Sequence, residues 1–331
     1  MNGNACMTDE YTKRVSVIVP VLNEERYIVM FWESLISQTF PHEEMEWIFV
    51  DGGSSDKTRD IIEDYAARYP IRLIRTAKGT PHQLNEGIMS SNGEYIVRMD
   101  AHVTYPEDYI EKCVGYLDNL DIDNVGGRVN TVAEGLIGHA IAEVLSSRFG
   151  VGGSQFRIGG GSGYVDTVPF GAFRREVFRK VGLFNEELIR SEDNDLNARI
   201  RAAGGKVYLA DDIWSDYHCR DTVQGMIRYG MQNGNALFHT IKMNPKAMSV
   251  RHFIPFLFVL SLIFLPLMGS RFVFFKYLFL AEISIYLLLD IVFSFAATEF
   301  LSGFLKLFLF PVFHISYGIG SLSGLIGIKL Y

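Results

Sequence analysis

Short apolar runs alternate with stretches of helical periodicity through the first hundred residues. The four runs cover residues 15–22, 46–53, 71–76 and 94–100. Runs that are apolar throughout are typical of parallel strands buried on both faces. After the second run Asp56 can cap a helix; its buried stripe would be Ile61, Ile62, Tyr65 and Ala66. "PHQLNEGIMSS" indicates another helix before the fourth run. This alternation predicts an α/β fold with an open, mostly parallel sheet.

The pattern changes completely near residue 253. Three apolar runs follow, "FIPFLFVLSLIFLPLMG", "FVFFKYLFLAEISIYLLLDIVFSFAA" and "FLSGFLKLFLFPVFHISYGIGSLSGLIG". A helix needs roughly 20 apolar residues to cross a bilayer. The sequence therefore predicts three regions, namely a polar tail (1–14), an α/β domain (15–250) and two or three membrane helices (251–331). A buried hairpin in a soluble protein fits less well, because this part has too few polar residues to cover it.

Charged residues add three constraints. Lys276, Glu282 and Asp290 interrupt the second apolar run, so they face either a bundle interior or the membrane interface. Cations before the first run put the N-terminal domain in the cytoplasm by the positive-inside rule; they are Arg228, Lys242, Lys246 and Arg251. The net charge of −7 gives no basic patch for nucleic acid. The three cysteines are scattered, as in proteins of a reducing compartment.

Polar or glycine-rich segments follow three of the predicted strands. They are "PVLNE" (20–24), "DGGSSD" (51–56) and "DAH" (100–102). The carboxyl ends of parallel strands meet at one edge of the sheet, where ligands bind in open α/β folds. Neither the dinucleotide fingerprint GxGxxG nor the loop GxxxxGK[ST] occurs in the sequence. The crevice is therefore not predicted to carry out hydride transfer or P-loop chemistry.

Asp100 and His102 form a candidate cation site at the end of the fourth run. A carboxylate suits Mg²⁺, and an imidazole beside it favours Mn²⁺. Two ligands make an incomplete site, and Mg²⁺ usually completes its shell with substrate phosphates and water. The expected partner is therefore a diphosphate. The residues leave a second interpretation open, in which Asp100 caps the next turn and His102 is solvated.

Five motifs, taken in order, resemble glycosyltransferase family 2, the inverting sugar-transfer enzymes with the GT-A fold. They are "VSVIVPVLNEE", "VDGGSSDKT", "KGTPHQLNEGIMSSNGEYIVRMDAH", "VPFGAFRREVFRKVGLFNEEL" and "RSEDNDLNARIRAAGGKVYLADD", within residues 15–214. In particular the chain resembles membrane-attached glucosyltransferases of the succinoglycan-biosynthesis type, in which DAH replaces the usual DxD. The resemblance implies a GT-A (Rossmann-like) domain followed by membrane helices.

The resemblance also implies roles for the donor side. Pro20, Leu22 and Glu24 would line the nucleoside site, Asp51 would contact the base or ribose, and Lys78 would lie near the phosphates. Asp100 would bind the metal, Mg²⁺ or Mn²⁺, with His102 in place of the second acid of DxD, and His218 would complete the site or contact phosphate. Arg228 would meet the diphosphate. The chain departs from the family pattern at Leu22, often aromatic, and at Gly52, commonly an acid.

On the acceptor side, Asp193 matches the acid of the family's ED motif and would be the general base. Glu192, Phe170 and Gly171 would contact the acceptor. From the residues alone, "SEDNDLNARIRAAG" is also a good helix start, with Ser191 as the cap and acids at the positive end of the dipole. "QGMIRYG" does not match the QxxRW motif of processive synthases, which favours the addition of a single sugar.

The sequence thus predicts a multi-pass inner-membrane hexosyltransferase with its catalytic domain in the cytoplasm. It would move one hexose from a nucleoside diphosphate sugar, most simply UDP-glucose, to a polyprenyl-linked sugar for exopolysaccharide or another surface glycan. Tethering at the bilayer would raise the enzyme's concentration near such an acceptor. Two alternatives stay open, transfer directly to polyprenyl phosphate and a catalytically silent scaffold that only binds nucleotide sugar.

Overall fold

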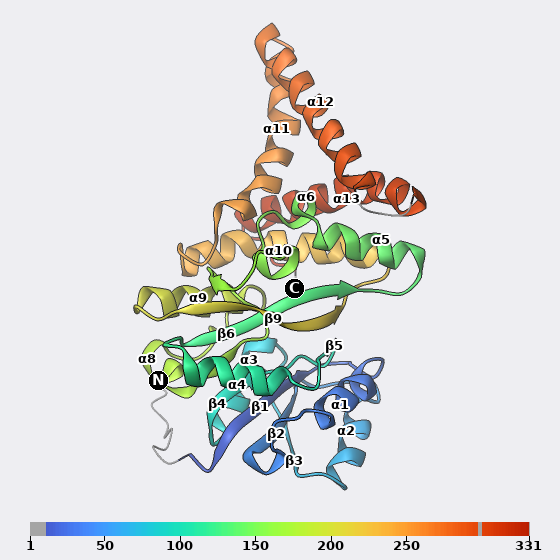
Figure 1. Cartoon of the computed structure of the whole chain (residues 1–331). Helices are drawn as coiled ribbons and strands as arrows, with labels where there is room; N and C mark the ends of the chain where they lie inside the picture. Colours follow the sequence, from blue (N-terminus) through green and yellow to red (C-terminus); the bar gives the residue numbers. More distant parts are fainter. Residues whose placement is uncertain (1–10, 297–299, 331) are drawn as a thin grey trace. The chain divides into compact units, whose positions relative to one another are not determined.

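The chain folds into two compact units in this computed structural model, which describes residues 11–296 and 300–330 (Figure 1). The first unit comprises Met1–Asn130 and Gly159–Tyr217, and the second comprises Thr131–Ile158 and His218–Tyr331. The predicted boundary between residues 250 and 251 lies inside the second unit and stays a prediction.

The parallel half of the sheet contains the four predicted strands. They are β1 (Lys13–Val21), β2 (Met45–Asp51), β3 (Ile71–Arg75) and β4 (Gly93–Arg98). They pair in parallel in the order β3-β2-β1-β4, and Val15 of β1 lies opposite both Met45 and Tyr95. β1 is buried from Val15 onward, which explains its almost unbroken apolar sequence. The strand order reverses direction between β1 and β4, and such a switch point opens a crevice at the carboxyl ends.

Helices connect these strands as the sequence predicted. They are α1 (Ile28–Ile36), the 3₁₀ turn η1 (His42–Glu44), α2 (Thr58–Ala66) and α3 (Thr80–Met89), and a further helix, α4 (Tyr109–Asn119), comes after β4. In α2 Ile62 is buried, whereas Ile61, Tyr65 and Ala66 are half-buried. The N-cap residue of α2 is Lys57, one position after the predicted Asp56. The Asp56 carboxylate still accepts the N–H of Thr58, the first residue of α2, at 3.0 Å, and it also accepts the N–H of Glu25 in the loop after β1 at 3.1 Å.

An antiparallel half extends the sheet beyond β4. Its strands are β5 (Val103–Thr104), β6 (Asn124–Val132), β7 (Gly163–Tyr164), β8 (Ala172–Arg174) and β9 (Val207–His218). The order continues β4-β8-β6-β9-β5, and β7 pairs with β9. Two helices belong to this half, α8 (Arg175–Val181) and α9 (Glu192–Ala202). The first unit therefore has the predicted α/β fold class, with a sheet that is parallel in one half and antiparallel in the other.

The second unit is helical. Its elements are α5 (Gly135–Ser146), α6 (Arg148–Val151), α7 (Gln155–Ile158), α10 (Val223–Met243), the 3₁₀ turn η2 (Val250–Phe253), α11 (Ile254–Gly269), α12 (Val273–Phe295) and α13 (Phe300–Leu325). Among the described residues, three helices are long and apolar enough to cross a membrane, at Val250–Gly269, Val273–Phe295 and Phe300–Leu325. They correspond to the three apolar runs of the sequence.

The charges inside the second apolar run divide between two environments. Glu282 of α12 accepts a hydrogen bond of 2.5 Å from the Ser261 hydroxyl of α11. Asp290 is buried and accepts from Ser294 at 3.1 Å. Lys276, one turn into α12, is exposed. The two acids therefore face protein, as expected for charges in an apolar helix, and the lysine does not.

Candidate active site at the carboxyl ends of the strands

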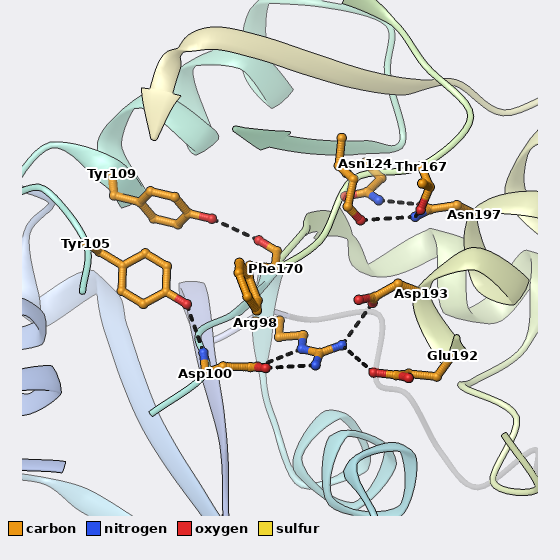
Figure 2. A network of polar contacts seen from close by, with 11 residues as sticks. Arg98, Asp100, Tyr105, Tyr109, Asn124, Thr167, Phe170, Glu192, Asp193 and Asn197 are labelled. Atoms are coloured by element: carbon orange, nitrogen blue, oxygen red, sulfur yellow. Dashed lines mark hydrogen bonds and ion pairs between the residues drawn. The ribbon is translucent and has the colours of Figure 1, made fainter. Parts of the chain in front are cut away.

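Arg98, the last residue of β4, is the centre of a buried ionic network (Figure 2). Its Nε and Nη2 donate to the two carboxylate oxygens of Asp100 at 2.7 and 2.9 Å. Its Nη1 donates to Glu192 Oε1 at 3.1 Å and to Asp193 Oδ1 at 2.9 Å. The structure thus joins the predicted donor-side acid, Asp100, to the predicted base, Asp193, although they lie far apart in the sequence.

Charge is unbalanced in this network, because one guanidinium faces three carboxyl groups. The side chains of Arg98, Asp100 and Glu192 are 6%, 9% and 11% exposed, and that of Asp193 is 21% exposed. Burial raises the pKa of Asp193 to about 7; the charge on Arg98 opposes this rise, and those on Glu192 and Asp100 add to it. Burial opposes the charge on Arg98, but the three carboxylates raise its pKa well above the usual value. Asp193 is therefore a stronger base than an exposed aspartate.

The first turn of α9 holds Glu192 and Asp193. Ser191 is the N-cap residue, as predicted, but its hydroxyl makes no capping hydrogen bond, because its backbone is left-handed, with φ 66°. Further along the helix, Asn197 donates to Thr167 Oγ1 at 2.9 Å and accepts from Asn124 Nδ2 at 2.7 Å. These buried amides fix α9 against β6 and the segment before β8 (Figure 2).

Left-handed backbone gathers around the predicted site. Within residues 11–296 and 300–330, three residues other than glycine have a positive φ, and they are Asn23, Phe170 and Ser191. Asn23 separates Leu22 from Glu24, Phe170 is a predicted acceptor residue, and Ser191 precedes the two acids of α9. Such conformations carry steric strain and cluster at functional sites. All three are predicted site residues or lie next to them in the sequence.

Three aromatic residues, Phe170, Tyr105 and Tyr109, lie along one side of the network (Figure 2). The Phe170 ring lies over the Arg98 guanidinium, with 5.9 Å between the ring centroid and Cζ. Its carbonyl accepts from the Tyr109 hydroxyl at 2.9 Å, and the Tyr105 hydroxyl accepts from the Asp100 N–H at 2.9 Å. Gly171 has no room for a side chain, since a Cβ would lie 2.3 Å from Asn124 Oδ1. The acceptor roles of Phe170, Gly171 and Glu192 stay predictions.

Asp51 and Gly52 lie at the end of β2, on the predicted nucleoside side. Asp51 is buried, and its Oδ1 accepts from the Ser54 N–H at 2.9 Å. A Cβ at Gly52 would lie 3.0 Å from the side chain of Gln83. Two hydrogen bonds fix the Gln83 amide in place, because its Nε2 donates to the carbonyls of Val21 and Val50 at 2.7 and 2.8 Å. Gln83 thus fills the space that a second acid at position 52 would need.

The remaining predicted residues lie at strand ends or in the second unit. Pro20 is buried near the end of β1, Leu22 just beyond it is half-buried, and Lys78 is exposed after β3. His218 is the last residue of β9 and Arg228 is exposed on α10, and both belong to the second unit. Their predicted roles with the donor and metal stay predictions.

The donor set for a divalent cation is small. No group of three His, Cys, Asp or Glu side chains suited to a metal occurs in the described part of the chain. His102 Nδ1 lies 3.1 Å from Glu24 Oε1, and both oxygens of Asp100 face Arg98. A carboxylate has about four acceptor positions, so Asp100 keeps capacity beyond Arg98, and the network has an excess of negative charge. These residues fit a cation that binds together with a diphosphate, with Asp100 and His102 as the protein ligands.

Sequence comparison finds relatives that match about two thirds of the chain. The family model for glycosyl transferase family 2 matches residues 16–182. The succinoglycan biosynthesis protein ExoA of Rhizobium meliloti is 30% identical over 218 residues, 64% of this chain and 66% of that protein. A Methanococcus voltae protein is 27% identical over 232 residues, 67% of this chain and 72% of its own length. Its name is dolichyl N-acetyl-alpha-D-glucosaminyl phosphate 3-beta-D-2,3-diacetamido-2,3-dideoxy-beta-D-glucuronosyltransferase.

Solved structures share the fold at low identity. The mannosyltransferase PcManGT from Pyrobaculum calidifontis, in complex with GDP-Man and Mn²⁺, has a TM-score of 0.64 and 18% identity. The match covers 95% of this chain and 88% of that one. S. aureus TarS 1-349 in complex with UDP-GlcNAc has a TM-score of 0.50 and 18% identity, with 95% and 92% covered. The predicted fold class, a mostly parallel α/β domain followed by apolar helices, is confirmed.

Proposed function

The chain belongs to glycosyl transferase family 2, and from this premise we propose that it is an inverting enzyme that transfers one hexose from a nucleoside diphosphate sugar to a lipid-linked sugar. UDP-glucose is the first donor to test. One observation carries the proposal, namely the ionic network that joins Asp193 to Asp100 through Arg98. It puts a carboxylate suited to proton removal beside the strand end where ligands bind in open α/β sheets.

Asp193 is the proposed general base. The acceptor hydroxyl must lose its proton while its oxygen attacks the anomeric carbon and the bond from that carbon to the diphosphate breaks. A carboxyl group with a pKa raised by burial to about 7 is half ionised near pH 7 and mostly ionised above it, and it is a stronger base than an ordinary aspartate. The attack comes from the face opposite the leaving group without a covalent intermediate, so the anomeric configuration inverts.

Arg98 is the proposed positioning residue for this base. Its guanidinium holds Asp193 and Glu192 with one nitrogen and Asp100 with two others. Fixed, desolvated charges of this kind need no rearrangement when the reaction begins. Arg98 would therefore keep the acceptor-side acids at a constant distance from the donor side.

The donor diphosphate is proposed to bind at Asp100, and Lys78 would approach its phosphates. Pro20, Leu22, Glu24 and Asp51 would line the nucleoside site. A divalent cation, Mg²⁺ or Mn²⁺, would be held by Asp100 and His102 and would stabilise charge on the leaving diphosphate. The structure of PcManGT with GDP-Man and Mn²⁺ supports this part of the proposal. His218 stays a candidate for the metal, and Arg228 for the diphosphate.

The acceptor is proposed to be a polyprenyl-linked sugar at the bilayer. The three long apolar helices support a membrane location. The relatives named for dolichyl-linked transfer and for succinoglycan biosynthesis support a lipid-linked acceptor and a product destined for exopolysaccharide or another surface glycan. We propose the inner membrane as the site, with the first unit in the cytoplasm, as the cations before α11 predict.

Calorimetry tests the donor part of the proposal. The full chain in detergent is titrated with UDP, GDP and dTDP, each with Mn²⁺ and with EDTA. We expect one nucleotide to bind in the presence of Mn²⁺ and not in EDTA. Asp100→Asn should weaken this binding, and Asp118→Asn, at an acid paired with Arg14 outside the network, should not. Failure of all three nucleotides to bind would contradict the donor assignment.

The acceptor part needs a separate competition. Lipid extracts, a purified polyprenyl diphosphate sugar and polyprenyl monophosphate are offered together with the donor identified by calorimetry. We expect label to enter the diphosphate-linked sugar. Preferential labelling of the monophosphate would favour direct transfer to the lipid carrier. Full activity on water-soluble sugars with none on lipid would contradict the lipid-linked acceptor.

A further inference from the structure

The two faces of α13 differ sharply in chemistry. Its exposed face is apolar and repeats at helical spacing, with Phe300, Phe304, Phe308, Ile315 and Ile319. Its covered face contains small and polar residues, among them Ser302, Lys306, His314, Ser316 and Ser321. The exposed face therefore needs apolar surroundings, whereas the covered face packs against other helices of the protein.

Hydrogen bonds and an ion pair fix the covered face of α13 to α5 and α6. Lys306 is 5% exposed and pairs with Glu143 of α5 at 3.1 Å. The Ser302 hydroxyl donates to the same carboxylate at 2.6 Å. His314 Nε2 lies 2.9 Å from the carbonyl of Phe149 in α6. These partners hold α13 at both its first and middle turns.

Close backbone packing fixes α13 to α10 along its second half. A Cβ at Gly234 of α10 would lie 1.9 Å from the Tyr317 carbonyl, and one at Gly320 of α13 would lie 2.1 Å from the Met231 carbonyl. Asn235 donates to the Ser323 hydroxyl at 2.8 Å and to the Ile328 carbonyl at 2.6 Å. The two helices therefore lie side by side, as Figure 1 shows. Because they are fixed to each other, one cannot cross a membrane without the other.

α10 is unsuited to a bilayer interior. Its sequence, VQGMIRYGMQNGNALFHTIKM, contains Arg228, Gln232, Asn233, His239 and Lys242, and the three membrane-length apolar helices of the described chain do not include it. If α13 crossed the membrane, α10 would cross beside it and take these groups into hydrocarbon, which is strongly unfavourable. The apolar composition of α13 is therefore satisfied in another way.

α11 and α12 have the opposite character. In the most apolar 18-residue stretch of each helix, 17% of α11 and 11% of α12 is buried inside the protein, compared with 44% of α13. α12 has 23 residues and is about 34 Å long, enough for a hydrocarbon core of about 30 Å. One end of each helix packs on α13, where the Tyr286 hydroxyl of α12 lies 2.9 Å from His314 Nδ1. Within the second unit the other ends form a hairpin that points away from α10 and α13 (Figure 1). Ser270 and Arg271 lie at its tip.

We propose that the α11–α12 hairpin alone crosses the bilayer, and that α13 lies in the membrane surface with its Phe300–Ile319 face against the acyl chains. An interfacial helix buries one apolar face at the boundary between headgroups and acyl chains while its other face stays covered. Two crossings return the chain to its starting side. The segment after α13 then lies on the same side as α10, and the hairpin tip lies on the other side.

Single cysteines test this topology in the full chain. Ser270→Cys marks the tip and Lys329→Cys marks the segment after α13, and both positions are exposed. The variants are made in a Cys6→Ser protein, whose two other cysteines, Cys113 and Cys219, are buried. Labelling of the Cys6→Ser protein without an added cysteine gives the background. Sealed right-side-out and inverted vesicles are treated with a membrane-impermeant maleimide, and detergent-opened vesicles give full labelling.

We expect the two cysteines to be labelled in vesicles of opposite orientation. Labelling of both in the same preparation would overturn the proposal. If that preparation is the right-side-out one, α13 is a third crossing; if it is the inverted one, the hairpin does not cross. Either result leaves the proposed sugar transfer untouched, because the test measures topology and not activity.

Discussion

Replacing Arg98 by Gln removes the only cation that the described contacts give to Asp100, Glu192 and Asp193. Removing one partner of a buried ion pair costs about 3–5 kcal/mol, because a charge is left buried without compensation. All four side chains are less than a quarter exposed, so solvent does little to reduce this cost. We expect Arg98→Gln to lower the free energy of unfolding of the first unit by about 3–5 kcal/mol at pH 8.

Arg14 offers a matched control, since it also pairs with two carboxylates. It contacts Glu94 at 2.7 Å and Asp118 at 2.8 Å, but its side chain is 38% exposed. Exposed pairs contribute about 0–1 kcal/mol, so Arg14→Gln should change stability by no more than that. Arg98→Lys should lie between the two, because it keeps the charge but loses the forked geometry.

The effect of Arg98→Gln should also depend on pH. In the wild type the pKa of Asp193 is raised to about 7, above that of the unfolded chain. The native state therefore holds a proton that the unfolded state has lost, and this contribution to stability falls as pH rises from about 4 to about 7. Without Arg98 the carboxyl groups should hold protons to still higher pH. The gap between wild type and Arg98→Gln should therefore be smaller at pH 5 than at pH 8.

Tryptophan fluorescence provides the assay. The three tryptophans, Trp32, Trp47 and Trp214, all belong to the first unit. Urea unfolding of the detergent-solubilised chain, followed by their emission, therefore reports on the unit that contains the network. The reasoning would be refuted if the free energies of unfolding of Arg98→Gln and Arg14→Gln differed by less than about 1 kcal/mol at both pH values. A difference that small is no more than one exposed ion pair contributes.

Three further predictions concern the site. Turnover should rise with pH through about 7 as Asp193 loses its proton, and a rate that stays flat from pH 5.5 to 8.5 would argue against Asp193 as the base. Gly52→Asp should weaken nucleotide binding and stability, because its Cβ would lie 3.0 Å from the buried Gln83 side chain; calorimetry and unfolding would check this, and an unchanged or tighter complex would contradict it. Ser191→Gly should be neutral or stabilising by up to about 1 kcal/mol, since a left-handed φ suits glycine and no side-chain cap is lost; a clear loss in urea unfolding would show another role for the hydroxyl.

Local patterns predicted the parallel half of the fold well. β1, β2 and β4 are mostly buried and largely apolar, and β3 is a short, part-exposed edge strand, so their identity and their shared carboxyl edge follow from the sequence. The antiparallel half was not specified to the same degree. Its strands depend on long-range pairing, as in β4 with β8 and β5 with β9, which leaves little local signal.

Arg98 is the site residue that sequence reasoning missed. It was counted as part of an apolar strand, although a cation at the end of the buried "EYIVRMD" run signals nearby acids. Its partners on α9 lie more than ninety positions away, so only the fold could reveal them. Ser191 was predicted as the helix cap from a local sequence motif. The motif does not reveal the left-handed backbone of Ser191, so the missing side-chain hydrogen bond could not be foreseen.

Sugar transfer itself tests the central claim most directly. Lipid vesicles containing the full chain are incubated with radiolabelled UDP-glucose, Mn²⁺ and a bacterial lipid extract, and label is measured in the organic phase. The account predicts transfer by the wild type and by Asp60→Asn, at an exposed acid of α2. It also predicts a loss of about 10²–10⁴-fold in Asp193→Asn, the usual value of a general base. Equal transfer by Asp193→Asn and the wild type would contradict the account.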